Sequence, residues 1–260
     1  MKFVLLSMLS IVLLGTGNVA HHLFDAFTQL DGVLVKQVYG RSPKSLASFA
    51  DKCDTVFKPE SIVDADIFII AVSDDAITEV SSLVSSKKGL VTHTSGNVSI
   101  DALQTNRKGV FYPLQTFTNG KAVDFSTIPI CIEADEPADL KTLKTLAEKI
   151  TESVYEISSE QREKLHLAAV FVNNFTNHMY TIGNEVCKKE DLPFDLLKPL
   201  IKETADKLRF LTPEKAQTGP AKRNDVLTMQ KHLDALESPL NKKIYQLISE
   251  SIKDKNEEKL

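Results

Sequence analysis

The segment that most constrains the fold spans residues 10–27 and reads SIVLLGTGNVAHHLFDAF. It opens with a short apolar run at residues 11–14, which is too short for a buried helix and suits a central strand. Glycines and a small residue follow in the spacing G-x-G-x-x-A, and the apolar positions after them recur with helical period. A strand, a glycine turn and an amphipathic helix in this order are the context in which such a motif binds a dinucleotide.

Each small residue of the motif has its own predicted role. Gly15 makes the tight turn, Gly17 lets the backbone approach a pyrophosphate, and Ala20 lets the helix pack on a sheet. The helix N-terminus then faces the phosphates. The alternative interpretation is a purely structural turn. On the first interpretation the residues that hold the pyrophosphate are Gly15, Thr16, Gly17, Asn18 and Val19.

The start of the chain allows a second interpretation. A lysine ahead of the apolar run at residues 3–14 resembles a secretory signal peptide. Cleavage after Ala20, however, would remove the first strand and the glycine turn of a domain whose later elements are all present. Met8 offers a start within the run, so we interpret residues 1–7 as an upstream extension and expect a cytoplasmic protein.

Composition narrows the class of protein. A chain of 260 residues with 42% hydrophobic residues suffices for one large domain or two modest ones. The net charge of -4, without a basic block, argues against a nucleic-acid partner, and no later apolar run has membrane-spanning length. The three cysteines are isolated and odd in number, which fits a reducing compartment and indicates no metal site.

As far as residue 157, short apolar segments alternate with helical ones. Nearly continuous apolar strands indicate a parallel sheet covered on both faces, so we predict an α/β fold with a Rossmann-type parallel sheet at residues 1–157. The helices after the second and fourth strands are expected to end near Asp51 and Ser85. The predicted strands are residues 11–14, 33–39, 55–57, 66–72, 89–93, 110–112, 128–133 and 154–156.

Residues 158–260 have helical periodicity instead, and we predict a C-terminal all-α domain that serves dimerisation. Its leucines recur on faces with more apolar surface than one chain covers, which predicts a homodimer through residues 158–252. The predicted helices are residues 158–189, 194–210, 225–236 and 240–252.

The end of the second strand indicates which dinucleotide binds. An acidic residue there would favour NAD, but the strand is followed by Arg41 and Ser42, and no carboxylate occurs before Asp51. A guanidinium with a hydroxyl suits the 2′-phosphate of NADP. The alternative is an ordinary solvated arginine. We predict NADP as the cofactor.

Three loops at the carboxyl ends of strands are chemically unusual, at residues 71–73, 93–97 and 112–117. Such loops form the site in parallel sheets. We expect the first to lie beside the cofactor through Ala71, Val72 and Ser73. In the second, Ser95 is expected to orient substrate. His93 either contacts substrate or nicotinamide, or only pins the loop.

The first long helix carries a polar stripe. His166, Asn173 and Asn177 are seven and four residues apart, so α-helical spacing places them on one face. They form either a row facing substrate or a network between helices. The segment at residues 217–225 is the other polar concentration, where Asp225 is a candidate helix cap.

Together these pieces resemble the reductases related to 6-phosphogluconate dehydrogenase, ketopantoate reductase and pyrroline-5-carboxylate reductase. More closely, the chain resembles a bacterial group that pairs a Rossmann-like domain with a helical domain of unknown function. In the wider family the helical domain usually mediates dimerisation and lends residues to the active site. The motifs that carry the closer resemblance are GTGNVAHHL (15–23), HTSG (93–96), YPLQTF (112–117), HLAAVFVNNFTN (166–177) and QTGPAKRND (217–225).

One departure from the family concerns the proton donor. Hydroxyacid-type members carry a lysine four residues before an asparagine on this helix, where this chain has Ala169 or Val170. His166 is the expected replacement, with Asn173 orienting substrate. We predict an NADP-dependent oxidoreductase that transfers a hydride to or from a small carbonyl or imine compound in an interdomain cleft. The alternatives are a non-catalytic NADP-binding sensor or partner protein, and a reductase that uses a deazaflavin as hydride partner.

Overall fold

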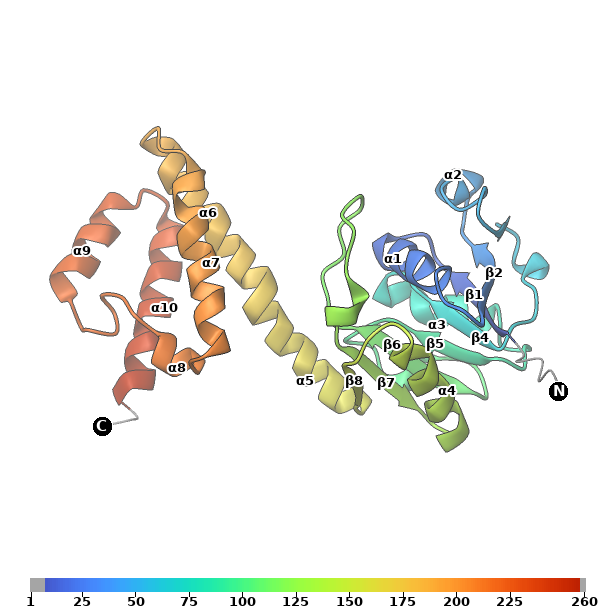
Figure 1. Ribbon diagram of the computed structural model, residues 1–260. Helices are drawn as coiled ribbons and strands as arrows, with labels where there is room; N and C mark the ends of the chain where they lie inside the picture. Colours follow the sequence, from blue (N-terminus) through green and yellow to red (C-terminus); the bar gives the residue numbers. More distant parts are fainter. Residues whose placement is uncertain (1–7, 258–260) are drawn as a thin grey trace. The chain divides into compact units, whose positions relative to one another are not determined.

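The structure, a computed structural model, describes residues 8–257. The extension expected at residues 1–7 lies outside the described residues, as do residues 258–260. The chain forms two compact units, one ending at Val170 and the other beginning at Phe171. The first holds the sheet, and the second is helical (Figure 1).

The first unit is built on one eight-stranded sheet in the order β3-β2-β1-β4-β5-β6-β7-β8. Its first six strands have the Rossmann order, in which ligands bind beyond the carboxyl ends of the strands where the order reverses, between β1 and β4. The predicted α/β class is therefore confirmed. The strands are β1 (Leu9–Leu14), β2 (Val33–Tyr39), β3 (Asp54–Val56), β4 (Ile67–Ile70), β5 (Leu90–His93), β6 (Lys108–Pro113), β7 (Ile130–Ala134) and β8 (Val154–Glu156).

Strand β7 departs from the predicted parallel sheet. It pairs antiparallel with β6, with Pro113 opposite Ile130, whereas β8 is again parallel to β7. The connection over residues 114–129 contains only a short 3₁₀ helix. It therefore lacks the crossover helix that usually carries the chain back to the start of a parallel neighbouring strand. The prediction of parallel pairing was wrong at this position.

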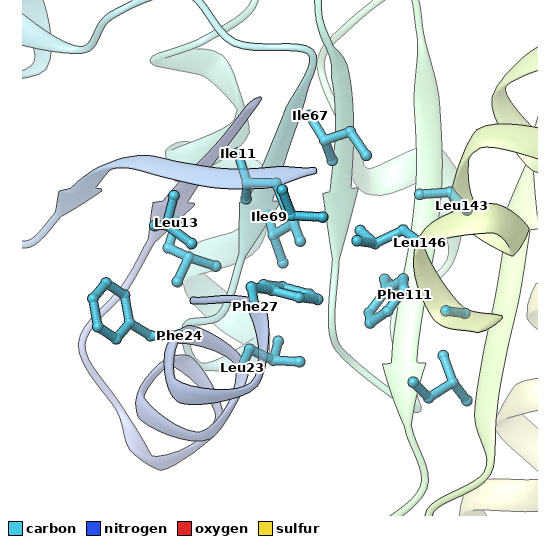
Figure 2. Close-up of a cluster of buried hydrophobic side chains, with 14 of the residues drawn as sticks. Ile11, Leu13, Leu23, Phe24, Phe27, Ile67, Ile69, Phe111, Leu143 and Leu146 are labelled. Carbon is cyan, nitrogen blue, oxygen red and sulfur yellow. The ribbon is translucent and has the colours of Figure 1, made fainter. Parts of the chain in front are cut away.

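Each central strand is buried on both faces, which explains its continuous apolar sequence. In β1, Ile11 faces one core and Val12 the other. Figure 2 shows Phe27 of α1, Phe111 of β6 and Leu146 of α4 in the first core. The Phe27 and Phe111 rings meet edge to face at 5.9 Å. Burying each such side chain contributes about 1.5–3 kcal/mol.

Helices cover both faces of the sheet, and two are shorter than predicted. The helix after β2 ends at Leu46 and that after β4 at Ser82, because i→i+3 turns follow, as in the bond from Phe49 N–H to Leu46 O. The helices of this unit are α1 (Asn18–Phe27), α2 (Pro43–Leu46), η1 (Pro59–Ser61), η2 (Asp74–Ala76), α3 (Ile77–Ser82), η3 (Ile100–Ala102), η4 (Phe125–Thr127), α4 (Pro137–Glu148) and α5 (Ser159–Ala169).

The second unit buries little of its own apolar surface. Among its described residues, Ala221 and Met229 are the buried ones, while Leu200 and Phe210 are more than half exposed. Its elements are the π-helix η5 (Val170–Phe175), which begins one residue before the unit, α6 (Thr176–Lys189), η6 (Phe194–Leu197), α7 (Lys198–Asp206), η7 (Lys207–Arg209), α8 (Pro213–Ala216), α9 (Val226–Ala235) and α10 (Pro239–Glu257).

The π-helix η5 interrupts the spacing on which one prediction relied. The expected common face of His166, Asn173 and Asn177 assumed α-helical spacing, but η5 has i→i+5 turns, which rotate later residues about the axis. The Thr176 hydroxyl donates to the carbonyl of Phe171, five residues back (3.2 Å), and so supports the wider turn. The α-helical spacing on which the common-face prediction relied is therefore interrupted between His166 and Asn177.

The helices also bear on the expectation of no membrane segment. Within residues 8–257, none combines the length and the hydropathy that crossing a bilayer needs.

Candidate functional site

A cleft of about 670 Å³ lies beyond the carboxyl ends of the parallel strands of the first unit. Nine of the ten residues predicted to bind the cofactor line it, and Ser42 lies just outside. They come from the turn after β1, the end of β2 and the turn after β4, which only the folded sheet brings together. The nine are Gly15, Thr16, Gly17, Asn18, Val19, Arg41, Ala71, Val72 and Ser73.

The glycine turn shows why side chains are absent there. Gly15 has φ +131°, and a Cβ on it would lie 2.1 Å from the carbonyl oxygen of Ala71, so this position requires glycine. Gly17 is the N-cap of α1 and has no side-chain cap. The first N–H groups of α1 are thus left available to an anion, as the motif predicts.

The part of the cleft lined by Arg41, Val80 and Leu83 suits an adenosine phosphate. Arg41 is exposed, two residues beyond the end of β2, and it forms no ion pair with any residue in 8–257. The Ser42 hydroxyl accepts from the N–H of Ser45 and caps α2 (3.4 Å). Val80 and Leu83 add an apolar wall on the far side. A phosphate would thus find a free guanidinium, and a purine ring an apolar surface.

The loop over residues 114–129 closes a further side through Gln115 and Phe117. Two bonds tie it to α1: Asn18 Nδ2 donates to the carbonyl of Phe117 (3.0 Å), and His22 Nε2 donates to that of Thr118 (3.1 Å). Sequence analysis singled out this loop but missed the roles of Asn18 and His22 side chains, because their partners are distant in the chain.

His166 lies on α5, within the first unit, and contacts Tyr112 near the end of β6. The Tyr112 hydroxyl is 3.2 Å from Nδ1 of His166. Both rings pack against Gly96, two residues beyond Thr94, which lines the cleft. Burial raises the pKa of Tyr112 to about 12. Sequence analysis included Tyr112 in an unusual loop but did not pair it with His166.

His93 is fully buried at the end of β5. Its Nδ1 accepts from the N–H of Ser95 (3.2 Å), and the Ser95 hydroxyl accepts from the N–H groups of Asn97 (3.0 Å) and Val98 (3.1 Å). Burial, assisted by the charge of Arg162, lowers the pKa of His93 to about 4. Of the two predicted roles, the observed contacts match pinning of the loop.

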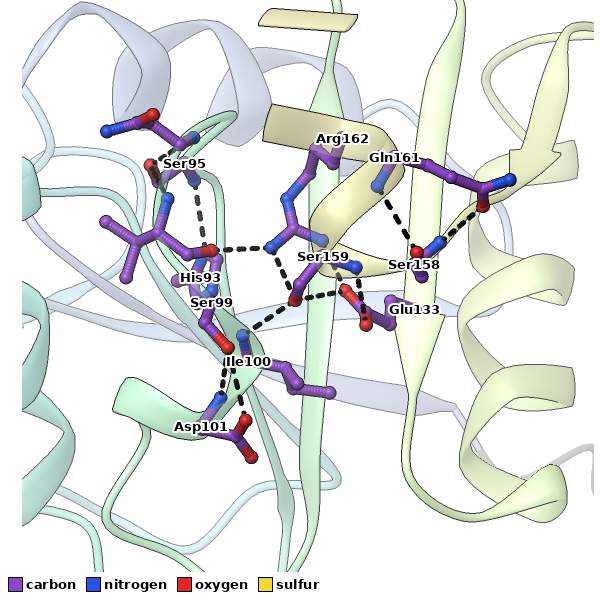
Figure 3. A network of polar contacts seen from close by, with 12 residues as sticks. His93, Ser95, Ser99, Ile100, Asp101, Glu133, Ser158, Ser159, Gln161 and Arg162 are labelled. Atoms are coloured by element: carbon purple, nitrogen blue, oxygen red, sulfur yellow. Dashed lines mark hydrogen bonds and ion pairs between the residues drawn. The ribbon is translucent and has the colours of Figure 1, made fainter. Parts of the chain in front are cut away.

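A buried arginine, which sequence analysis missed, fastens this loop to α5 and β7 (Figure 3). Arg162 is 1% exposed, pairs with the carboxylate of Glu133 and donates to the carbonyl of Val98 (2.5 Å). Ser159 donates to the same carboxylate (2.8 Å) and accepts from the N–H of Ile100 (2.9 Å). The buried charge is thus compensated, and the loop that carries Gly96 is held beside His166.

The remaining predicted residues lie in the second unit. Asn173 is in η5 and Asn177 in α6, and both are exposed. Asp225 caps α9 by accepting from the N–H of Thr228 (3.1 Å), which is the structural role considered for it. Within the described residues, no cluster of three potential ligands could hold a metal ion.

Comparison with known proteins places the chain in a family. No curated protein matches its sequence. The profile described as NADP oxidoreductase, coenzyme F420-dependent, matches residues 10–96, and a domain of unknown function (DUF2520) matches residues 128–252. The solved structure of BF3122 from Bacteroides fragilis, assigned as an NADP oxidoreductase, is 39% identical, covers 96% of this chain and 99% of its own, and has a TM-score of 0.88. The chain belongs to this family of NADP oxidoreductases.

More distant structures share the family's fold. Protein TM1727 from Thermotoga maritima is 21% identical, covers 96% of this chain and 99% of its own, and has a TM-score of 0.76. A reductive aminase from Aspergillus terreus, solved with NADPH and ethyl levulinate, is 12% identical with a TM-score of 0.69, and covers 95% of this chain and 94% of its own. The predicted resemblance to a Rossmann-like group with a helical domain of unknown function is confirmed.

Proposed function

We propose that the protein is an NADP-dependent oxidoreductase that transfers a hydride to or from a small carbonyl or imine compound. The observation that carries the proposal is the cleft, where an uncapped helix start, a required glycine and a free Arg41 line one cavity. The 39% identical relative assigned as an NADP oxidoreductase supports the cofactor. The reductive aminase with NADPH supports a carbonyl or imine substrate.

The residues fit the cofactor at both ends. The turn at Gly15–Val19 would hold the pyrophosphate, and Arg41 with Ser42 the 2′-phosphate. Ala71, Val72 and Ser73 would lie beside the nicotinamide half, with Phe117 excluding water. When bound, NADPH supplies the hydride.

The protein must supply a proton, because a carbonyl or imine that gains hydride gains negative charge. We assign this role to His166, since the expected lysine is absent and an imidazole can give and take a proton, which the amide of Asn173 cannot do. His93 is a poorer candidate because burial keeps it neutral and away from the cleft surface. Ser95 and Asn173 remain candidates for orienting substrate.

The test is a screen of small carbonyl and imine compounds with NADPH, followed by absorbance, on the wild type and His166→Gln. On a substrate found this way, His166→Gln should lower turnover by roughly 10²–10⁴-fold, the usual loss of a general acid. Its affinity for NADPH should stay unchanged. Full activity of His166→Gln would contradict the assignment, and tight NADPH binding without any turnover would favour the non-catalytic sensor.

One observation favours a second candidate function. The profile that matches residues 10–96 is described as coenzyme F420-dependent. A deazaflavin could therefore replace the carbonyl compound as hydride partner. Mixing the protein with NADPH and an oxidised deazaflavin decides this, because only that activity bleaches the deazaflavin absorbance.

We also propose that the protein acts in the cytoplasm as a homodimer. Its three cysteines, Cys53, Cys131 and Cys187, are free thiols in the structure, as a reducing compartment favours. The exposed apolar residues of the helical unit support self-association.

A further inference from the structure

The contact between Tyr112 and His166 joins three segments of the first unit. Tyr112 is the last residue but one of β6 and is 9% exposed, His166 lies one turn beyond Arg162 on α5, and Gly96 lies in the loop after β5. The two rings meet edge to face, with centroids 6.3 Å apart. The Tyr112 hydroxyl is 3.2 Å from Nδ1 of His166, so the contact involves one specific nitrogen of the imidazole.

Gly96 leaves room for this contact. A Cβ at this position would lie 2.6 Å from Nδ1 of His166 and 2.8 Å from the Tyr112 hydroxyl, so one of these groups would have to move. Nδ1 is therefore covered on two sides, by a phenol and by the backbone of the loop. Nε2 is the nitrogen of His166 left for other partners.

The charge state of a proton donor fixes the direction of the hydrogen bond. A histidine that gives up a proton does so as imidazolium, in which both nitrogens carry hydrogen. The Nδ1–H of the charged ring must then donate, and the phenol oxygen must accept. Phenylalanine could fill the same space but offers no acceptor.

We propose that Tyr112 is a positioning residue for His166. Its hydroxyl oxygen accepts a hydrogen bond from Nδ1–H of His166, so that proton transfer to the substrate takes place at Nε2. The role in turnover rests on the proposed function, whereas the contact itself does not. In the reducing direction the Nε2–H bond breaks and an O–H or N–H bond forms on the product. The electron pair stays on Nε2, and water later restores the proton.

Tyr112 keeps its own proton throughout. Burial is the main reason that its pKa is about 12, and Cys131 and Asp74 act in the same direction while Arg162 opposes them. A tyrosinate beside His166 is therefore unfavourable at neutral pH. This separates a positioning role from a relay in which the phenol would supply the proton.

The experiment compares wild type, Tyr112→Phe and the control Tyr155→Phe by NMR of ¹⁵N-histidine over a range of acidic pH, following the His166 signals of the charged ring. Tyr155 is an exposed tyrosine on β8. In wild type and in the control, the Nδ1–H of His166 should be protected from exchange with water. Tyr112→Phe should lose this protection. On an identified substrate, turnover by Tyr112→Phe should fall about 10- to 150-fold at unchanged KM for NADPH, the scale of one hydrogen bond to a charged group.

Gly96→Ala provides a second variant should Tyr112→Phe fold poorly. Its Cβ displaces the ring or the hydroxyl, so it too should lose protection of Nδ1–H. If the Nδ1–H of His166 stays protected from exchange in Tyr112→Phe, the proposal is overturned. It is also overturned if Tyr112→Phe loses this protection but keeps the turnover of the wild type. A wild type that turns over no substrate contradicts the proposed function, while the NMR result still decides the contact.

Discussion

Arg41 is the residue on which the choice of nicotinamide cofactor depends. It is the first residue beyond Gly40 at the end of β2, it lines the cleft, and its guanidinium has no recorded ion pair among residues 8–257. We expect NADPH to bind more tightly than NADH by roughly 1.5–3 kcal/mol, the scale of a hydrogen bond to a charged group. Arg41→Ala should remove most of this difference, whereas Lys44→Ala, outside the cavity lining, should keep it. Titration of both nucleotides checks this, and equal wild-type affinities would refute it.

His93 should make the protein less stable in acid. Its pKa is about 4 in the folded protein, because of burial and the charge of Arg162, whereas the ordinary value is 6.5. At pH values between these two pKa values, His93 is protonated in the unfolded chain and neutral in the folded protein. Stability is therefore full above about pH 6.5 and falls as the pH drops toward about 4, by about 3 kcal/mol for the whole interval.

Denaturant unfolding at several pH values tests this in wild type and in His93→Gln. The variant should be less stable at neutral pH, where it loses the acceptor for Ser95, but its stability should depend less on pH. The exposed His178 provides the control, since His178→Gln should retain the wild-type pH dependence. An equal decline in His93→Gln would show that other groups cause it.

At the scale of elements, the central strands were predicted well because burial on both faces leaves a continuous apolar run, as in β1 and β4. The antiparallel direction of β7 was not predicted, because it depends on how the loop at residues 114–129 turns. The π-helix η5 was missed because apolar periodicity does not distinguish one widened turn.

The candidate site also has a part that the sequence predicted and a part that it did not. The glycine turn could be predicted because its chemistry is local to the chain. Tyr112 and His166 are 54 residues apart, and Arg162 reaches Val98 from 64 residues away, so their contacts depend on tertiary packing. A charged residue one turn into a helix carries no signal that its side chain is buried.

The loop at residues 114–129 should depend on α1. Asn18→Ala removes the bond to Phe117, and His22→Ala removes the bond to Thr118. Both should speed amide hydrogen exchange in the loop, since each bond contributes about 1 kcal/mol. Only Asn18→Ala should also weaken NADPH binding, because Asn18 lines the cleft and His22 does not. Exchange unchanged in both variants would show that the loop is held by its own contacts, such as the stacking of Phe117 on Phe125.

At the scale of the whole molecule, the two units differ in how they bury apolar surface. The first unit has two cores, one on each face of the sheet. The second leaves large apolar side chains exposed along several helices. The exposed ones include Leu196, Leu200, Leu208, Phe210, Leu227, Leu240 and Leu247.

This difference predicts a homodimer through the helical unit. A stable interface buries about 1,200–2,000 Å² in total, which requires a broad apolar surface of this kind. Sedimentation should show a dimer at micromolar concentration. Leu200→Asp should shift the protein toward monomer, because a charge buried without a partner opposes association. Leu34→Asp places the same charge on an exposed leucine of β2, in the first unit, and should leave the dimer intact. A wild type that sediments only as monomer would contradict the prediction, because the exposed side chains of the second unit would then have no partner chain to cover them.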